Sequence, residues 1–220
     1  MAEQGRPEPL ITPRAAAASA SAGCTLAGAG AVTLAVLAGP GPGLTGYVSE
    51  AGIAGSGHAP MYRIGVYALA AGLLLLAAAL LPALRAAAAL LAAAGLGTAL
   101  SGAVTCTAGC PLPPFERATV ADLVHGGASI MATAAVIFAM VAIALSGRAG
   151  GQLRRLSAIA AAVALPLCAA VGLAMLLVGR GALVGVLERL VLAIAVLWGL
   201  AVAATVGLTG RWTSTDDVRL

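Results

Sequence analysis

The chain has 220 residues, of which 61% are hydrophobic, 9% are charged and 3% are aromatic, and its formal net charge is +4. A soluble domain carries about 25% charged residues, so this composition excludes a water-soluble globular domain. All basic residues are arginines scattered between apolar runs, which excludes the concentrated basic surface of a nucleic-acid-binding protein.

Six apolar stretches follow one another along the chain, separated by glycine, proline or charged residues. A helix that crosses the hydrocarbon core of a bilayer needs roughly 20 residues, and each stretch comes close to that length. The predicted spans are 18–40, 62–83, 87–105, 122–146, 157–178 and 184–208. The sequence therefore predicts an all-α polytopic bundle of six transmembrane helices.

These spans form a single predicted membrane domain over 18–210. The flanking segments, 1–17 and 211–220, are predicted cytoplasmic tails. A very short turn around Pro82 and Arg85 joins the second and third spans, which predicts a tight antiparallel hairpin.

The arginines predict the orientation, because cytoplasmic loops carry the excess of basic residues. With the N-terminus inside, the cytoplasmic set is Arg6, Arg14, Arg85, Arg148, Arg154, Arg155, Arg211 and Arg219. The outer set is then Arg63, Arg117, Arg180 and Arg189. Eight against four favours both termini in the cytoplasm.

Both histidines and several acids then lie at the predicted outer ends of the helices. The first outer loop carries Glu50 and His58, and the second span opens with Arg63. The second outer loop leads into Asp122 and His125. We therefore predict a polar site on the outer face.

Glu188 and Arg189 lie near the start of the last predicted span. If that helix begins near Ala182, they lie about 9–10 Å along it. Charges at that depth usually point into the bundle and pair. Three interpretations remain open. The helix begins later, at Leu187, and both charges lie among the headgroups; the charges brace helices without chemistry; or they bind a substrate.

Adjacent residues of a helix diverge by about 100°, so these two charges are expected to contact different helices. The sequence suggests Arg63 as the partner of Glu188. It suggests Glu50 or Asp122 as the partner of Arg189.

Asp122 and His125 are three residues apart and share a helix face. A carboxylate beside an imidazole can fix its tautomer and raise its basicity, which suits general acid/base work. The alternatives are an N-terminal helix cap with a packed histidine, or a metal site with His58 and Glu50. No established metal-ligand spacing supports the last, so we expect no metal and no cofactor.

Cys106 and Cys110 lie in an outer loop rich in proline and glycine. The extracytoplasmic side is oxidising, which favours a disulfide, and a separation of four residues permits one if the loop bends sharply. Cys24 and Cys168 lie inside apolar spans and are expected to pack as small apolar residues.

Several short motifs carry a resemblance to a known family. They are Ser49-Glu50-Ala51-Gly52, Met61-Tyr62-Arg63-Ile64-Gly65, the loop Thr105 to Pro111, His125 at the start of the fourth span, and Gly185-Val186-Leu187-Glu188-Arg189. Over roughly residues 20–210 the chain resembles the bacterial and archaeal membrane family called domain of unknown function 998. The resemblance implies six spans and a polar outer cluster, but no established activity. It also leads us to expect the chain in the plasma membrane of a bacterial cell.

Three functions remain open. The first is a non-enzymatic membrane protein that binds a lipid or small ligand or is structural. The second is an intramembrane enzyme acting on a lipid or prenyl substrate, such as a terpene cyclase or lipid hydrolase. The third is a small transporter, although paired broken helices are not visible in matching halves.

In the enzyme, the predicted catalytic residues are Glu50, Asp122 and His125. The predicted ligand-binding or ion-pairing residues are Arg63, Glu188, Arg189 and His58. Membrane lipids are the expected partners. The enzyme hypothesis adds a hydrophobic or prenyl substrate, and no nucleic acid is expected to bind. The sequence identifies no protein partner.

Overall fold

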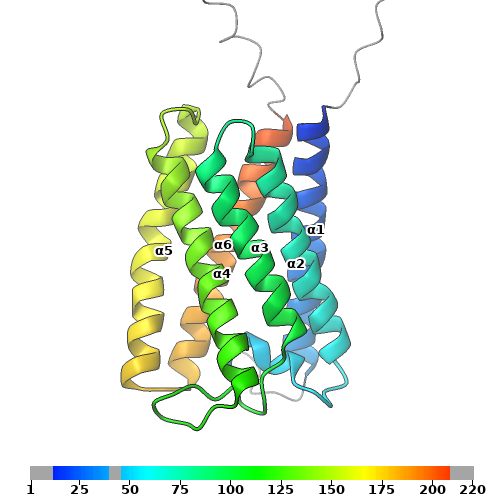
Figure 1. The fold of residues 1–220 in the computed structure, drawn as a ribbon, viewed down its shortest axis with the longest axis vertical. Helices are drawn as coiled ribbons and strands as arrows, with labels where there is room; N and C mark the ends of the chain where they lie inside the picture. Colours follow the sequence, from blue (N-terminus) through cyan, green and yellow to red (C-terminus); the bar gives the residue numbers. More distant parts are fainter. Residues whose placement is uncertain (1–11, 40–45, 209–220) are drawn as a thin grey trace, which may run out of the picture.

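The computed structural model describes residues 12–39 and 46–208. All regular secondary structure in these ranges is helical (Figure 1), and all six α-helices are long and apolar enough to cross a membrane. The elements are α1 (Pro13–Ala38), η1 (Val48–Gly52), α2 (Ala59–Leu80), α3 (Arg85–Ala103), α4 (Val120–Leu145), α5 (Gly151–Leu177) and α6 (Ala182–Leu208). The predicted all-α, six-span fold is confirmed, and the chain is a multi-pass membrane protein.

The six helices form a ring in chain order. Each helix packs against the next, α6 returns to α1, and α6 also touches α2 and α4. The start of α1 and the end of α6 lie at the same end of the bundle (Figure 1). We call this the terminal end, and we call the opposite end, with η1, 104–119 and 178–181, the loop end.

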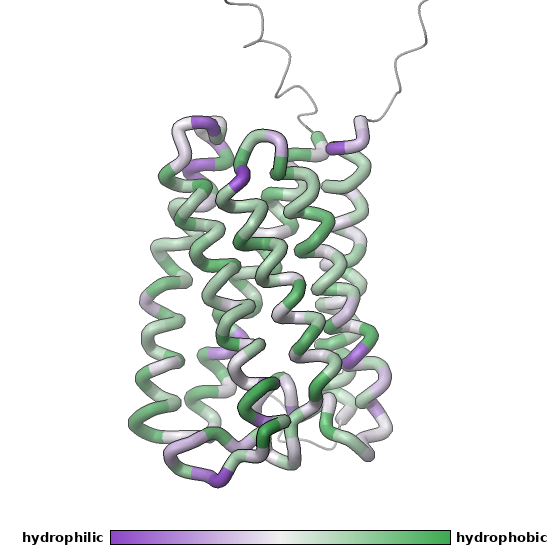
Figure 2. The backbone as a smooth tube through the Cα atoms, in the orientation of Figure 1, coloured by the Kyte–Doolittle hydropathy of each residue, from purple (hydrophilic) through white to green (hydrophobic). Residues whose placement is uncertain are grey.

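Hydrophobic residues dominate the helices along their length, and polar residues gather near the two ends (Figure 2). Inward-facing residues of all six helices form one buried cluster that includes Leu76, Leu91, Met140 and Val202. Other large apolar side chains are exposed around the bundle, as a helix surface that faces lipid requires.

Small residues bring α1 and α2 into close contact. A Cβ atom on Gly28 would lie 2.7 Å from the backbone oxygen of Gly65, and one on Gly72 would lie 2.6 Å from Oγ1 of Thr25. The hydroxyl of Ser21 donates a hydrogen bond to the carbonyl of Gly72 at 2.7 Å. Small residues drive helix association in lipid because they permit such backbone approach.

The fifth helix differs most from its predicted bounds. It begins at Gly151, six residues before the predicted start at 157, so Arg154 and Arg155 lie inside its first turns. The apolar stretch located the membrane-crossing part, whereas the hydrogen-bonded helix continues past it into polar sequence.

Candidate functional site

The start of α4 is organised by the carboxylate of Asp122, which is 1% exposed. It accepts hydrogen bonds from the backbone N–H groups of Thr107, at 2.7 Å, and Thr119, at 2.8 Å. It also accepts from both threonine hydroxyls, at 3.0 Å and 2.7 Å. One buried carboxylate therefore ties the loop 104–119 to the first turn of α4.

This arrangement differs from the cap that the sequence suggested. Thr119 is the N-cap residue, and its Oγ1 accepts from the N–H of Asp122 at 3.2 Å. Asp122 lies three positions later and completes a capping box. The Thr-x-x-Asp spacing before an apolar run is a sequence signal for this motif, and it was the signal that could have identified Thr119.

The ring of His125 is 5% exposed and is held by backbone carbonyls. Its Nδ1 lies 2.9 Å from the carbonyl oxygen of Ser101 and 2.8 Å from that of Val104. Carbonyl oxygens only accept, so Nδ1 carries a proton. These carbonyls, at the end of α3, take the orienting role that the sequence analysis had given to Asp122.

Two serines extend this contact between α3 and α4. The hydroxyls of Ser101 and Ser129 lie 2.7 Å apart, and that of Ser129 donates to the carbonyl of His125 at 2.9 Å. Isolated serines in an apolar helix carry little sequence signal, so their role becomes visible only when the two helices are paired.

Cys106 and Cys110 lie beside His125, and both are buried. Their sulfur atoms are within bonding distance, and their Cα atoms are 5.0 Å apart. The loop bends sharply at Gly109 and Cys110, which have left-handed φ angles of 83° and 46°. This is the bend that a four-residue separation requires.

A second polar group surrounds η1 at the loop end. The N–H of Val48 donates to a carboxylate oxygen of Glu188 at 3.1 Å. The guanidinium of Arg189 donates to the carbonyls of Gly46 and Gly185. Consecutive charges of α6 thus hold the segment that leads into η1.

The start of α6 bears on one interpretation left open by the sequence. Because α6 begins at Ala182, Glu188 lies six residues into the helix, about 9 Å along its axis. The alternative in which the helix begins at Leu187 is therefore wrong.

Glu50 is half-buried and closes η1 on itself, because its side chain accepts from the N–H of Tyr47 at 3.0 Å. Burial raises the pKa of the Tyr47 phenol, and the negative charge of Glu188 raises it further. The phenol therefore stays neutral at physiological pH and can donate a hydrogen bond.

The two polar groups meet at Ser49. Its hydroxyl lies 3.3 Å from the sulfur of Cys110, so η1 touches the cysteine loop directly. The structure therefore brings Glu50, Glu188 and Arg189 around η1, and Asp122 and His125 around the cysteine loop, as two adjoining groups rather than one shared pocket.

Arg63 and His58 belong to neither group. The side chain of Arg63 is exposed and forms no ion pair within the described ranges, so Glu188 is held by Val48 instead. His58 is half-buried directly before α2, and its Nδ1 makes no hydrogen bond to the described residues.

Arg180 covers the cysteine loop from the turn between α5 and α6. A Cβ atom on Gly109 would lie 3.0 Å from its guanidinium, and the left-handed φ of Gly109 also favours glycine at this position. Arg180 also pairs with Glu116 at 3.3 Å, but both side chains are more than a third exposed. An exposed pair of this kind contributes about 0–1 kcal/mol.

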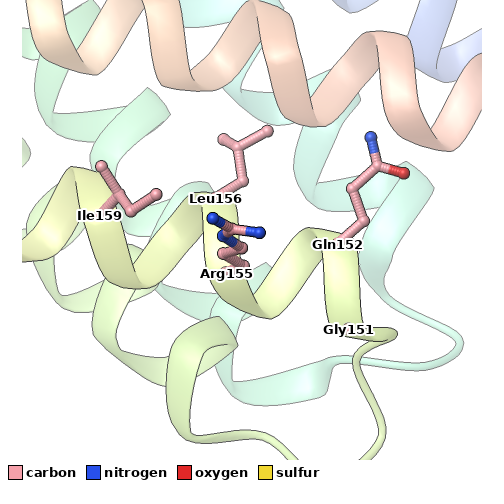
Figure 3. A pocket seen from close by; sticks show the side chains of 5 residues that line it. All are labelled: Gly151, Gln152, Arg155, Leu156 and Ile159. Atoms are coloured by element: carbon pink, nitrogen blue, oxygen red, sulfur yellow. The ribbon is translucent and has the colours of Figure 1, made fainter.

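A groove of about 420 Å³ lies at the terminal end, far from these groups. It is lined by Gly151, Gln152, Arg155, Leu156 and Ile159, all from α5 (Figure 3). Among the described residues, Arg155 is the only charged one that lines it. Because a ligand site usually has several converging polar groups, the loop end is the stronger candidate.

A known protein family matches most of this sequence. The family described as "Protein of unknown function (DUF998)" matches residues 16–205. The chain belongs to this family. The match includes both polar groups of the loop end, so the DUF998 region contains every candidate site residue. No curated protein and no solved structure matches this DUF998 chain.

Proposed function

We propose that this DUF998 protein is a non-enzymatic protein of the bacterial plasma membrane whose loop end is a hydrogen-bonded structural cap. The observation that supports this most is the saturated carboxylate of Asp122, buried with four donors from Thr107 and Thr119. A general acid must exchange a proton with its substrate. A carboxylate whose oxygens are occupied by the fold is better suited to holding a loop.

The charges around η1 support the same conclusion. Glu188 accepts from the backbone of Val48, and Arg189 donates to backbone carbonyls of Gly46 and Gly185. Charges inside a membrane helix are costly unless they are paired. Here they satisfy the backbone of an irregular segment that lies against the bundle, a bracing role.

Membrane lipids are the proposed partners of the outer helix surfaces. Large apolar side chains remain exposed on several helices, among them Ile64, Ile130, Phe138, Ile159, Leu173 and Leu197. We place both termini in the cytoplasm, because the basic residues are concentrated on that side. The shared position of both described chain ends supports an even number of crossings (Figure 1).

The test is a product search with the protein in its membrane environment. The purified chain is reconstituted into phosphatidylethanolamine and phosphatidylglycerol liposomes that contain geranylgeranyl diphosphate. Lipids are then analysed by mass spectrometry over a day. We expect the lipid composition to match that of protein-free liposomes. Time-dependent formation of a cyclised or hydrolysed product would overturn the proposal.

An intramembrane enzyme is the second candidate, and the surroundings of η1 favour it. Glu50 and Glu188 both lie beside this segment, and burial together with the charges of Glu188 and Glu50 raises the pKa of the Tyr47 phenol. In this alternative, Glu50 is the general acid for a prenyl or lipid substrate. Glu50→Gln should then abolish product formation while the melting temperature in detergent stays within a few degrees of wild type.

A further inference from the structure

Three buried side chains at the loop end have the chemistry of metal ligands. Cys106, Cys110 and His125 are 5%, 6% and 5% exposed. Their sulfur atoms and a ring nitrogen all lie within 4.8 Å of one another. Zinc bonds to sulfur at about 2.3 Å and to nitrogen at about 2.0 Å, so its ligand atoms lie about 3.3–3.8 Å apart. A small adjustment brings all three to one ion.

The hydrogen bonds of His125 prepare it for this role. Its Nδ1–H is directed at the carbonyls of Ser101 and Val104. A metal-binding histidine almost always donates its other ring N–H to a carbonyl, carboxylate or water, because this fixes the tautomer and raises the basicity of the ligand nitrogen. The end of α3 therefore supplies the supporting contacts of such a ligand.

The cysteine loop is also held in place independently of any ion. Asp122 binds both the N–H and the hydroxyl of Thr107, which lies between the cysteines. The N–H of Cys110 donates to the carbonyl of Thr107 at 2.9 Å. This frame keeps both cysteines beside His125, so little ordering would be required when an ion binds.

We propose that Cys106, Cys110 and His125 form a metal site that is controlled by the redox state of the two cysteines. In the oxidised protein the sulfurs share a disulfide bond and hold no ion. A dithiol reduces that bond with two electrons and two protons, and is itself converted to a disulfide. The two thiols then lose their protons when the ion binds.

The ligand set selects a thiophilic ion. Two thiolates and a neutral imidazole carry a charge of −2, and soft sulfur ligands favour copper(I) and zinc(II). Three ligands suit copper(I), whereas zinc(II) takes a fourth ligand such as water. The hydroxyl of Ser49, 3.3 Å from the sulfur of Cys110, marks the side on which such a ligand would sit.

This site was not predicted from the sequence. The metal alternative considered there combined Asp122 and His125 with His58 and Glu50, and the cysteines were predicted to form a disulfide. The loop between Cys106 and His125 brings the three together, and no spacing rule for known metal motifs predicts that fold.

The experiment uses the full chain in detergent, with Cys24 and Cys168 replaced by alanine so that only the site cysteines remain. One sample is reduced with a phosphine that is then removed without oxygen, and one is left oxidised. Copper(I) is titrated against bicinchoninate, and zinc(II) against a pyridylazo dye. We expect the reduced protein to take up one equivalent of one of these ions, and the oxidised protein to take up none.

Two variants show which residues bind the ion. Reduced Cys106→Ser/Cys110→Ser protein should bind no ion, and His125→Asn should weaken binding by about tenfold or more. Helical circular dichroism and the gel-filtration elution volume control for folding. Equal uptake by the reduced and oxidised samples, or full uptake by the double serine variant, would overturn the proposal. The double variant decides this even if His125→Asn does not fold.

Discussion

Replacing Asp122 with alanine removes the acceptor of four hydrogen bonds and leaves the backbone N–H groups of Thr107 and Thr119 without a partner. A buried donor left unsatisfied costs about 1–3 kcal/mol. Both threonines are exposed, so water can replace part of the loss. We therefore expect Asp122→Ala to lower the free energy of unfolding by about 2–3 kcal/mol.

The assay is equilibrium unfolding of the purified protein in mixed micelles, followed by circular dichroism. Glu116→Gln is the matched control, because it removes an acid of the same loop whose ion pair with Arg180 is exposed. Such a pair contributes about 0–1 kcal/mol, so the control should change stability little. Asp122→Asn keeps one acceptor oxygen and should lie between the two.

A double-mutant cycle tests the cause of the loss. Thr107→Val removes one donor to the carboxylate, so its effect should be smaller in the Asp122→Ala background than in the wild type. If Asp122→Ala costs no more than Glu116→Gln, or if the two effects add fully, the carboxylate does not hold the loop.

Three further predictions concern orientation, packing and η1. In a variant lacking the two cysteines inside the spans, Gly57→Cys should react with an impermeant maleimide on intact cells and Gly147→Cys should not; the reverse would refute cytoplasmic termini. Gly28→Leu should lower the free energy of unfolding more than Gly30→Leu, because only Gly28 lies against backbone of α2; equal losses would contradict that close contact. Glu188→Leu should speed hydrogen exchange of the Val48 amide at the start of η1, measured by mass spectrometry, since its acceptor is lost; unchanged protection would show that η1 is held by other contacts.

The number and placement of the helices could be predicted from the sequence because the cost of burying charge in lipid is large. Charged residues therefore mark the limits of each apolar stretch. The start of α5 was predicted too late for the same reason. Arg154 and Arg155 lie just before the apolar stretch and mark its N-terminal limit. Arginine is a good helix former, so the helix itself begins before them.

The grouping of the polar residues could not be predicted in the same way. A soluble helix shows its inner face by an apolar stripe, whereas a membrane helix is apolar on both its lipid-facing and its inner side. The sequence therefore gives little indication of which side of each helix faces the bundle. Arg63 was expected inside the bundle and is exposed, while Ser101 and Ser129, which carry little signal, lie in the contact between α3 and α4.

The contact between α1 and α6 has a consequence for how the protein is made. The ring closes only when the last helix has entered the membrane, and α6 also carries Trp198, whose indole donates to the hydroxyl of Ser157 in α5 at 3.0 Å. A nascent chain that stops before α6 keeps a polar hydroxyl and an open flank exposed to lipid, and η1 lacks its anchor. Membrane proteases should therefore degrade such a chain faster than the complete one. Insertion of the last helix is then the step after which the protein resists proteolysis.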